Sequence, residues 1–158
     1  MINNFVRYQK SLAINDLYPK LESGKCSCGC GQNLVGLQKK WASKDCKSKA
    51  LLQFYITKGD MSVIREVLFK LDEGYCRSCG VYDEKWEADH ILPVFKGGAG
   101  LGIENYQTLC PHCHKIKTNL DRIPNSSNIH TTCFNISHPV FERFWTFNKK
   151  IFEDIVRY

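Results

Sequence analysis

The chain has 158 residues, 43% of them hydrophobic, and a formal net charge of +6. This length can bury one core but is short for two independent domains, and nowhere do about 18 apolar residues follow one another as in a membrane span. We therefore expect one compact cytoplasmic unit that has no membrane partner and whose positive charge favours a polyanionic partner.

Helical patterns account for most of the N-terminal half. Apolar residues recur at roughly helical spacing over residues 1–22, which predicts a packing helix. After a loop rich in Gly and Cys, Ser43 is placed to cap a helix that runs to about residue 58. A further helix is expected over 62–73, with Gly74 as its C-terminal stop. Its apolar face consists of Val63, Ile64, Val67, Leu68 and Leu71.

The C-terminal half reads as a hairpin followed by two helices. Residues 85–95 resemble a strand, the glycines of 97–100 form a turn, and a helix is expected from about Cys113. A final helix capped by Ser137 carries a wide apolar stripe, which predicts core packing; contact with a second copy or a larger complex is the alternative. The stripe consists of Val140, Phe141, Phe144, Trp145, Ile151, Phe152, Ile155 and Val156.

Nine cysteines lie in close clusters, which is more typical of metal sites in a reducing compartment than of a disulfide scaffold. Two CxxC knuckles, Cys76 with Cys79 and Cys110 with Cys113, can each present two sulfurs to one tetrahedral zinc ion. The alternative is unrelated buried cysteines or a redox pair, but two CxxC units about 30 residues apart rarely arise by accident. A closed four-cysteine zinc site is structural and would compensate for a small core.

Four polar residues lie between or directly beside these knuckles: Asp89, His90, Asn105 and His114. Hydrolysis of a phosphodiester needs a hard cation, which Asp89 and His114 could hold while leaving positions for water and substrate. It also needs a base, and His90 is the candidate because an imidazole titrates near neutral pH. Asn105 cannot titrate, so we expect it to form hydrogen bonds within the hairpin loop and to fix the orientation of His90 or of its backbone.

The same stretch resembles a known nuclease family. Residues 86–93 read Trp-Glu-Ala-Asp-His-Ile-Leu-Pro, Gly97 and Gly98 follow, and residues 105–115 read Asn-Tyr-Gln-Thr-Leu-Cys-Pro-His-Cys-His-Lys. This pattern is similar to the zinc-stapled HNH (ββα-metal) endonucleases, in particular bacterial and phage HNH nucleases and the HNH module of annealing helicases.

The resemblance maps the family's first histidine onto His90, its asparagine onto Asn105, its last histidine onto His114 and its metal-binding aspartate onto Asp89. His112 competes for the metal, but the family's ligand directly follows a cysteine, so we expect His112 to be exposed. The resemblance implies a small α+β fold with a ββα-metal core and one-metal cleavage with Mg²⁺, Mn²⁺ or another divalent ion, leaving 5′-phosphate and 3′-hydroxyl ends.

We accordingly expect a DNA endonuclease or nickase of a bacterial or phage-infected cell. The expected organisation is an N-terminal helix and zinc finger over 1–59, the nuclease core over 60–122, and a loop with a packing helix over 123–158. The alternative function is a zinc-dependent module that binds nucleic acid, or serves in assembly, without cutting.

A second set of sulfurs in the N-terminal part could complete another zinc site: Cys26, Cys28, Cys30 and Cys46. It resembles the small treble-clef-like finger that often precedes HNH modules. Ala42 stands where that pattern has its third cysteine, and the extra sulfur of Cys-x-Cys-x-Cys is the candidate to replace the missing ligand. Nearby lysines either contact phosphate or form an ordinary solvated helix face. These are Lys39, Lys40, Lys44, Lys47 and Lys49.

Overall fold

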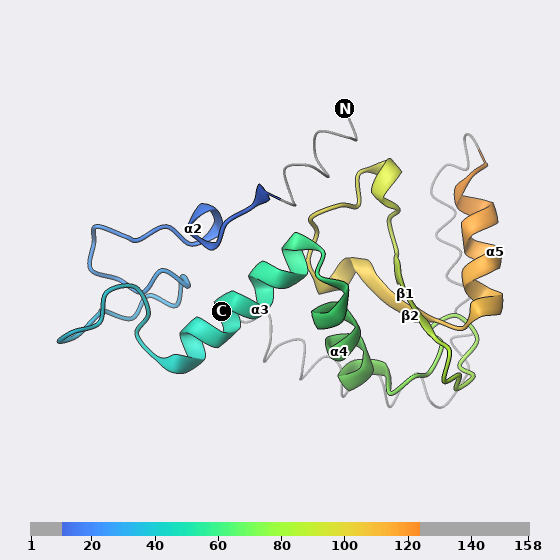
Figure 1. The fold of residues 1–158 in the computed structure, drawn as a ribbon, viewed down its shortest axis with the longest axis horizontal. Helices are drawn as coiled ribbons and strands as arrows, with labels where there is room; N and C mark the ends of the chain where they lie inside the picture. The colour runs from blue at the N-terminus through green and yellow to red at the C-terminus, as the bar shows by residue number, and fades with distance from the viewer. Residues whose placement is uncertain (1–10, 124–158) are drawn as a thin grey trace.

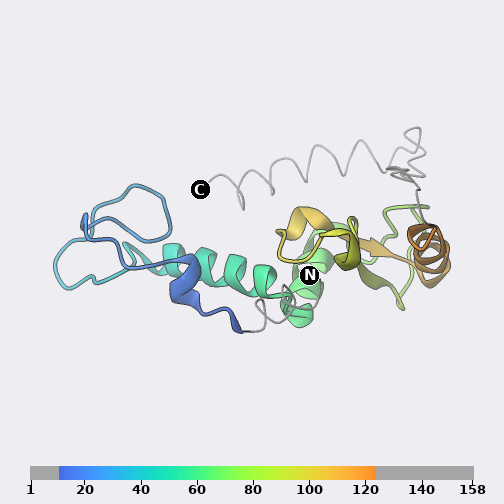
Figure 2. The same cartoon turned by 90° about the horizontal axis from the view of Figure 1, so that it is seen from above.

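The computed structural model describes residues 11–123, which form a small α+β fold. A two-stranded antiparallel hairpin, β1 (Glu87–His90) and β2 (Tyr106–Leu109), lies between two helices, α4 (Met61–Asp72) and α5 (Pro111–Asp121) (Figure 1). The longer helix α3 (Lys44–Lys58) precedes α4. Figures 1 and 2 agree that the loop segment before α3 lies at one end of the molecule and α5 at the other.

Local capping explains where α3 and α4 begin and end. The Ser43 hydroxyl accepts a hydrogen bond from the Cys46 backbone N–H at 3.0 Å, and Gly59, at φ +78°, ends α3 in the left-handed conformation. The Asp60 carboxylate caps α4 in the same way. Both predicted helices are confirmed to within one residue. No helix within residues 11–123 is both long and apolar enough to cross a membrane.

The main core is built on the face of α4 that its apolar spacing predicted. This face packs against the hairpin and against the last turn of α3, so that Ile56 of α3 shares the core with side chains of α4 and of the hairpin region. Each large apolar side chain buried here contributes on the order of 1.5–3 kcal/mol. The buried members are Ile56, Ile64, Val67, Leu68, Leu71, Trp86, Ile103 and Tyr106.

The hairpin is joined by a long loop rather than a tight turn. Two 3₁₀ turns, η1 (Val94–Lys96) and η2 (Ile103–Asn105), lie in this loop, and the strands pair so that Asp89 faces Gln107 and His90 faces Tyr106. The following helix begins two residues earlier than expected, because Pro111 occupies its first position and the Cys110 sulfur accepts from the Cys113 N–H at 3.5 Å.

The prediction of a packing helix through residue 22 is wrong for its second half. Among the described residues of this region, Ser11 and α2 (Ile14–Leu17) are helical, and α2 ends at Tyr18. Pro19 follows, and a proline disfavours helical backbone at the residue before it; Tyr18 has φ −128° and ψ 73°. Residues 1–10 and the expected C-terminal helix with its apolar stripe lie outside the described part.

Candidate active site and metal centres

The four-cysteine frame expected from the two CxxC knuckles is assembled in the structure. The sulfurs of Cys76, Cys79, Cys110 and Cys113 all lie within 4.8 Å of one another, and the Cys79 and Cys110 sulfurs are 3.9 Å apart. Zinc–sulfur bonds of about 2.3 Å place tetrahedral sulfurs roughly 3.8 Å apart, so this set fits one zinc ion. Cys76 and Cys110 are buried beside Leu109 in a small apolar cluster of their own.

A partly buried ion pair ties the first knuckle to the hairpin. Arg77 donates from Nε to both carboxylate oxygens of Asp72, at 2.8 and 2.9 Å, and Thr108 donates its hydroxyl to the same carboxylate at 2.6 Å. The Arg77 backbone N–H also bonds the Thr108 carbonyl at 2.8 Å. The end of α4, the knuckle and β2 are therefore held in one hydrogen-bonded unit, and Asp72 is only 2% exposed.

The two predicted ligands of the catalytic metal come from different elements and face each other. Asp89 lies on β1 and His114 on α5, and Oδ1 of Asp89 is 3.6 Å from Nε2 of His114. Two metal–ligand bonds of about 2.0–2.2 Å span donors up to roughly 4 Å apart, so one divalent ion fits between these atoms. Two protein ligands leave most of the coordination shell open for water and phosphate.

Further polar side chains surround this pair. Glu87 Oε2 lies 2.7 Å from Nδ1 of His114, and Gln107 Nε2 donates to Oδ2 of Asp89 at 3.0 Å. The Lys117 ammonium lies 3.0 Å from the same Oδ2 and bonds Asp121 at 2.6 Å. The sequence interpretation did not include Glu87, Gln107 or Lys117. The available signals were the two-residue spacing from Glu87 to Asp89 and the three-residue spacing from His114 to Lys117.

His90 borders a hollow of about 320 Å³, which Asp89 also lines. Its ring lies 4.4 Å from the ring of Tyr106, its partner across the hairpin. Burial lowers the pKa of His90; Asp89 opposes this shift, and Lys117 adds to it. The lowered pKa favours the neutral imidazole, the form that can accept a proton. The hollow is walled by Pro93, Val94, Phe95, Thr118, Asp121 and Arg122.

Asn105 holds the loop that follows His90. Its side-chain oxygen accepts from the Leu92 N–H at 2.8 Å, and its amide donates to the carbonyls of Leu92 and Gly98 at 3.1 and 2.8 Å. Its own carbonyl accepts from the Ile91 N–H. The amide thus contacts the backbone directly after His90 and does not bond the imidazole itself. Gly98 is required at this approach, because a Cβ there would lie 1.7 Å from the Leu92 carbonyl oxygen.

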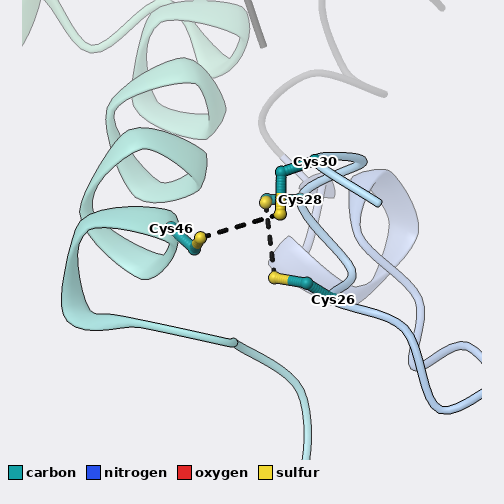
Figure 3. A group of neighbouring side chains, drawn as sticks. All are labelled: Cys26, Cys28, Cys30 and Cys46. Atoms are coloured by element: carbon teal, nitrogen blue, oxygen red, sulfur yellow. Dashed lines mark hydrogen bonds between the residues drawn. The ribbon is translucent and has the colours of Figure 1, made fainter. Parts of the chain in front are cut away.

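The N-terminal cysteines also converge (Figure 3). Cys26, Cys28 and Cys30 come from the loop and Cys46 from the first turn of α3, and their sulfurs lie within 4.8 Å of one another. The Cys30 and Cys46 sulfurs are 3.9 Å apart, as in a tetrahedral zinc site. Ala42, at the position of the missing cysteine, donates its backbone N–H to the Cys26 sulfur at 3.2 Å. This second set could therefore also hold zinc.

The basic residues of the N-terminal part lie close to this second cluster. Lys39, Lys44, Lys47 and Lys49 are exposed, whereas Lys40 is half-buried. The Lys40 ammonium donates to the Asn15 side chain at 2.6 Å and lies 5.0 Å from the centre of the Trp41 ring. At least one of the five lysines, Lys40, thus takes part in local packing.

His112, which was expected to be exposed, is exposed in the structure.

Comparison with known proteins points to one family. Residues 74–120 match the family model of the HNH endonuclease. The chain is similar to the DNA annealing helicase and endonuclease ZRANB3 of Mus musculus, with 32% identity over 98 residues, and of Homo sapiens, with 30% identity over 120 residues. These matches cover 61% and 49% of this chain but only 8% and 11% of the relatives, so the chain spans about a tenth of their length. No solved structure gives a significant match.

The matched stretch contains both CxxC knuckles, the facing pair Asp89 and His114, His90 on the hollow, and Asn105 in the loop. Residues 74–120 of this chain are therefore a domain of the HNH endonuclease family.

Proposed function

We propose that the chain is a divalent-metal-dependent endonuclease that hydrolyses phosphodiester bonds in DNA. The observation that carries the proposal is that Asp89 and His90 line one hollow inside the HNH domain while His114 faces Asp89 across 3.6 Å. The mammalian relatives are named as DNA annealing helicases and endonucleases, which supports DNA as the substrate.

Each of the four residues has a separate task in this proposal. Asp89 and His114 hold Mg²⁺ or Mn²⁺, and such an ion, when bound, supplies positive charge that offsets charge developing on the phosphate and the leaving oxygen. His90 accepts a proton from the attacking water on a ring nitrogen. Asn105 keeps the loop after His90 in place through its bonds to the backbone.

The remaining assignments concern the zinc sites, the basic residues and the setting of the protein. We propose zinc at both four-cysteine clusters, where it would fix the knuckles against the helices that follow them. Phosphate contacts by Lys39, Lys44, Lys47 and Lys49 are proposed beside the second cluster and would position DNA without reading its sequence. The expected domain boundaries, the bacterial or phage setting in the cytoplasm, and pairing of two chains through the C-terminal helix remain predictions; the relatives named above are mammalian.

A plasmid-cutting assay with Mg²⁺ or Mn²⁺ tests the proposal. The wild-type chain should nick or linearise the plasmid, EDTA should abolish cutting, and His90→Ala should lose it. The matched control is His112→Ala, because His112 is an exposed histidine two residues before His114 and outside the site. Equal cutting by wild type and His90→Ala would contradict the assignment. DNA binding without cutting under all metals would support the non-catalytic alternative.

A further inference from the structure

We propose that Glu87 and Gln107 are positioning residues of the catalytic metal site, with Glu87 fixing the ring of His114 and Gln107 fixing the carboxylate of Asp89. This inference rests on the proposed function, because it takes Asp89 and His114 to be the metal ligands. It deepens that function by naming the side chains that set the affinity of the site for its ion.

The fold places these side chains together by simple periodicity. Glu87 and Asp89 are two residues apart on β1, so they point to the same face of the hairpin. Gln107 is the direct cross-strand partner of Asp89, and directly opposed side chains share a face. On α5, His114 and Lys117 are three residues apart and also share a face. The hairpin and α5 therefore present these groups to one another.

On the histidine side, Glu87 decides which ring nitrogen is available. Glu87 Oε2 lies 2.7 Å from Nδ1 of His114, and the negative charge of the carboxylate at this distance favours a proton on Nδ1 over one on Nε2. The neutral ring then keeps its lone pair on Nε2, the atom that faces Asp89 at 3.6 Å. A carboxylate bound to the far nitrogen of a metal-binding histidine fixes its tautomer and ring orientation and raises its basicity.

On the aspartate side, Gln107 and Lys117 anchor one oxygen and leave the other for the ion. Both donors lie 3.0 Å from Oδ2 of Asp89, whereas Oδ1 faces His114. The Asp89 side chain is 16% exposed and that of Lys117 is 17% exposed, so water competes little for these contacts. The anchored carboxylate thus presents a single oxygen in a fixed direction.

Glu87 is better suited to this role than to that of a third ligand. Within residues 11–123, the groups that bring three or more candidate donors within 4.8 Å consist of cysteines alone, so Glu87 does not complete a set with Asp89 and His114. An ordinary exposed ion pair is the competing explanation, since the Glu87 side chain is 45% exposed and such pairs contribute little to stability. The two explanations differ in metal affinity, which an ordinary ion pair would leave unchanged.

Mn²⁺ titration of the DNA-free full chain, followed by the electron paramagnetic resonance signal of unbound Mn²⁺, measures this affinity. Glu87→Ala and Gln107→Leu should each bind Mn²⁺ about 10–100-fold more weakly than wild type, the usual effect of losing such a partner. Glu87→Gln keeps an acceptor oxygen and should recover part of the loss. At saturating Mn²⁺, cleavage by the variants should approach the wild-type rate.

The matched controls are Glu84→Ala and Gln53→Leu, because both residues are exposed and outside the site. Zinc content and thermal midpoint verify that the variants fold. If Glu87→Ala does not fold, the Mn²⁺ affinities of Glu87→Gln and Gln107→Leu are compared with that of the wild type instead. Wild-type affinity in folded variants overturns the inference while leaving the nuclease proposal standing. A wild-type chain that cuts DNA but binds no Mn²⁺ would instead contradict the metal assignment itself.

Discussion

Exchange of Asn105 for aspartate is the sharpest single perturbation of the loop beside His90. The change is nearly isosteric and keeps the oxygen that accepts from the Leu92 N–H, but it replaces the amide that donates to the Leu92 and Gly98 carbonyls. Asn105 is 5% exposed, so water cannot readily replace the lost donors. The substitution therefore tests the donor function alone.

The magnitude follows from the two lost bonds. A typical hydrogen bond contributes about 0.5–1.5 kcal/mol, and a buried group left unsatisfied costs about 1–3 kcal/mol. In Asn105→Asp, two backbone carbonyls lose their donor and face a carboxylate oxygen instead. We therefore expect the free energy of unfolding to fall by about 2–5 kcal/mol. Because the loop directly follows His90, cleavage should fall as well, by about a hundredfold if the imidazole moves by an ångström.

Urea unfolding in the presence of excess zinc measures the stability loss, and amide hydrogen exchange at Leu92 reports whether the loop has opened. Asn33→Asp is the matched control, because Asn33 is exposed. A loss below about 0.5 kcal/mol together with unchanged Leu92 exchange would refute the reasoning, since that is the range of ordinary surface substitutions.

Three further predictions concern the frame around the site. Asp72→Asn should lower the free energy of unfolding by about 3–5 kcal/mol in urea, because it leaves the partly buried Arg77 without its counter-charge. Gly98→Ala should reduce cleavage about a hundredfold with unchanged zinc content, because the new methyl group displaces the loop from the Leu92 carbonyl. Metal analysis should find two zinc ions per chain and one after Cys28→Ser; an unchanged content would remove Cys28 from the ligand set.

Local signals predicted the parts of the fold that depend on neighbouring residues. Ser43 and Gly74 marked helix ends because capping acts within one turn, and the apolar spacing of α4 indicated the face that the core covers. The knuckle spacing predicted the Cys76 to Cys113 frame because each CxxC unit is geometrically self-contained. Apolar spacing alone gave a wrong prediction for residues 18–22, where Pro19 follows the end of the short helix α2.

The sequence singled out Asp89 and His114, which face each other in the structure, but not Glu87 and Gln107, which contact them. Gln107 reaches Asp89 only through the strand register, and a long loop between two strands leaves that register undefined in the sequence. Glu87 meets His114 only after α5 packs on the hairpin. Contacts between elements far apart in the chain therefore required the structure.

The assignment of His90 as base and His114 as ligand is tested most directly by single-turnover cleavage of a labelled DNA duplex over a range of Mn²⁺ concentrations. His114→Ala should weaken the dependence on Mn²⁺, so that added metal restores part of the cleavage. His90→Ala should bind Mn²⁺ as the wild type does and remain inactive at every concentration. Cleavage by His90→Ala that rises to the wild-type rate with added Mn²⁺ would contradict the proposed general base.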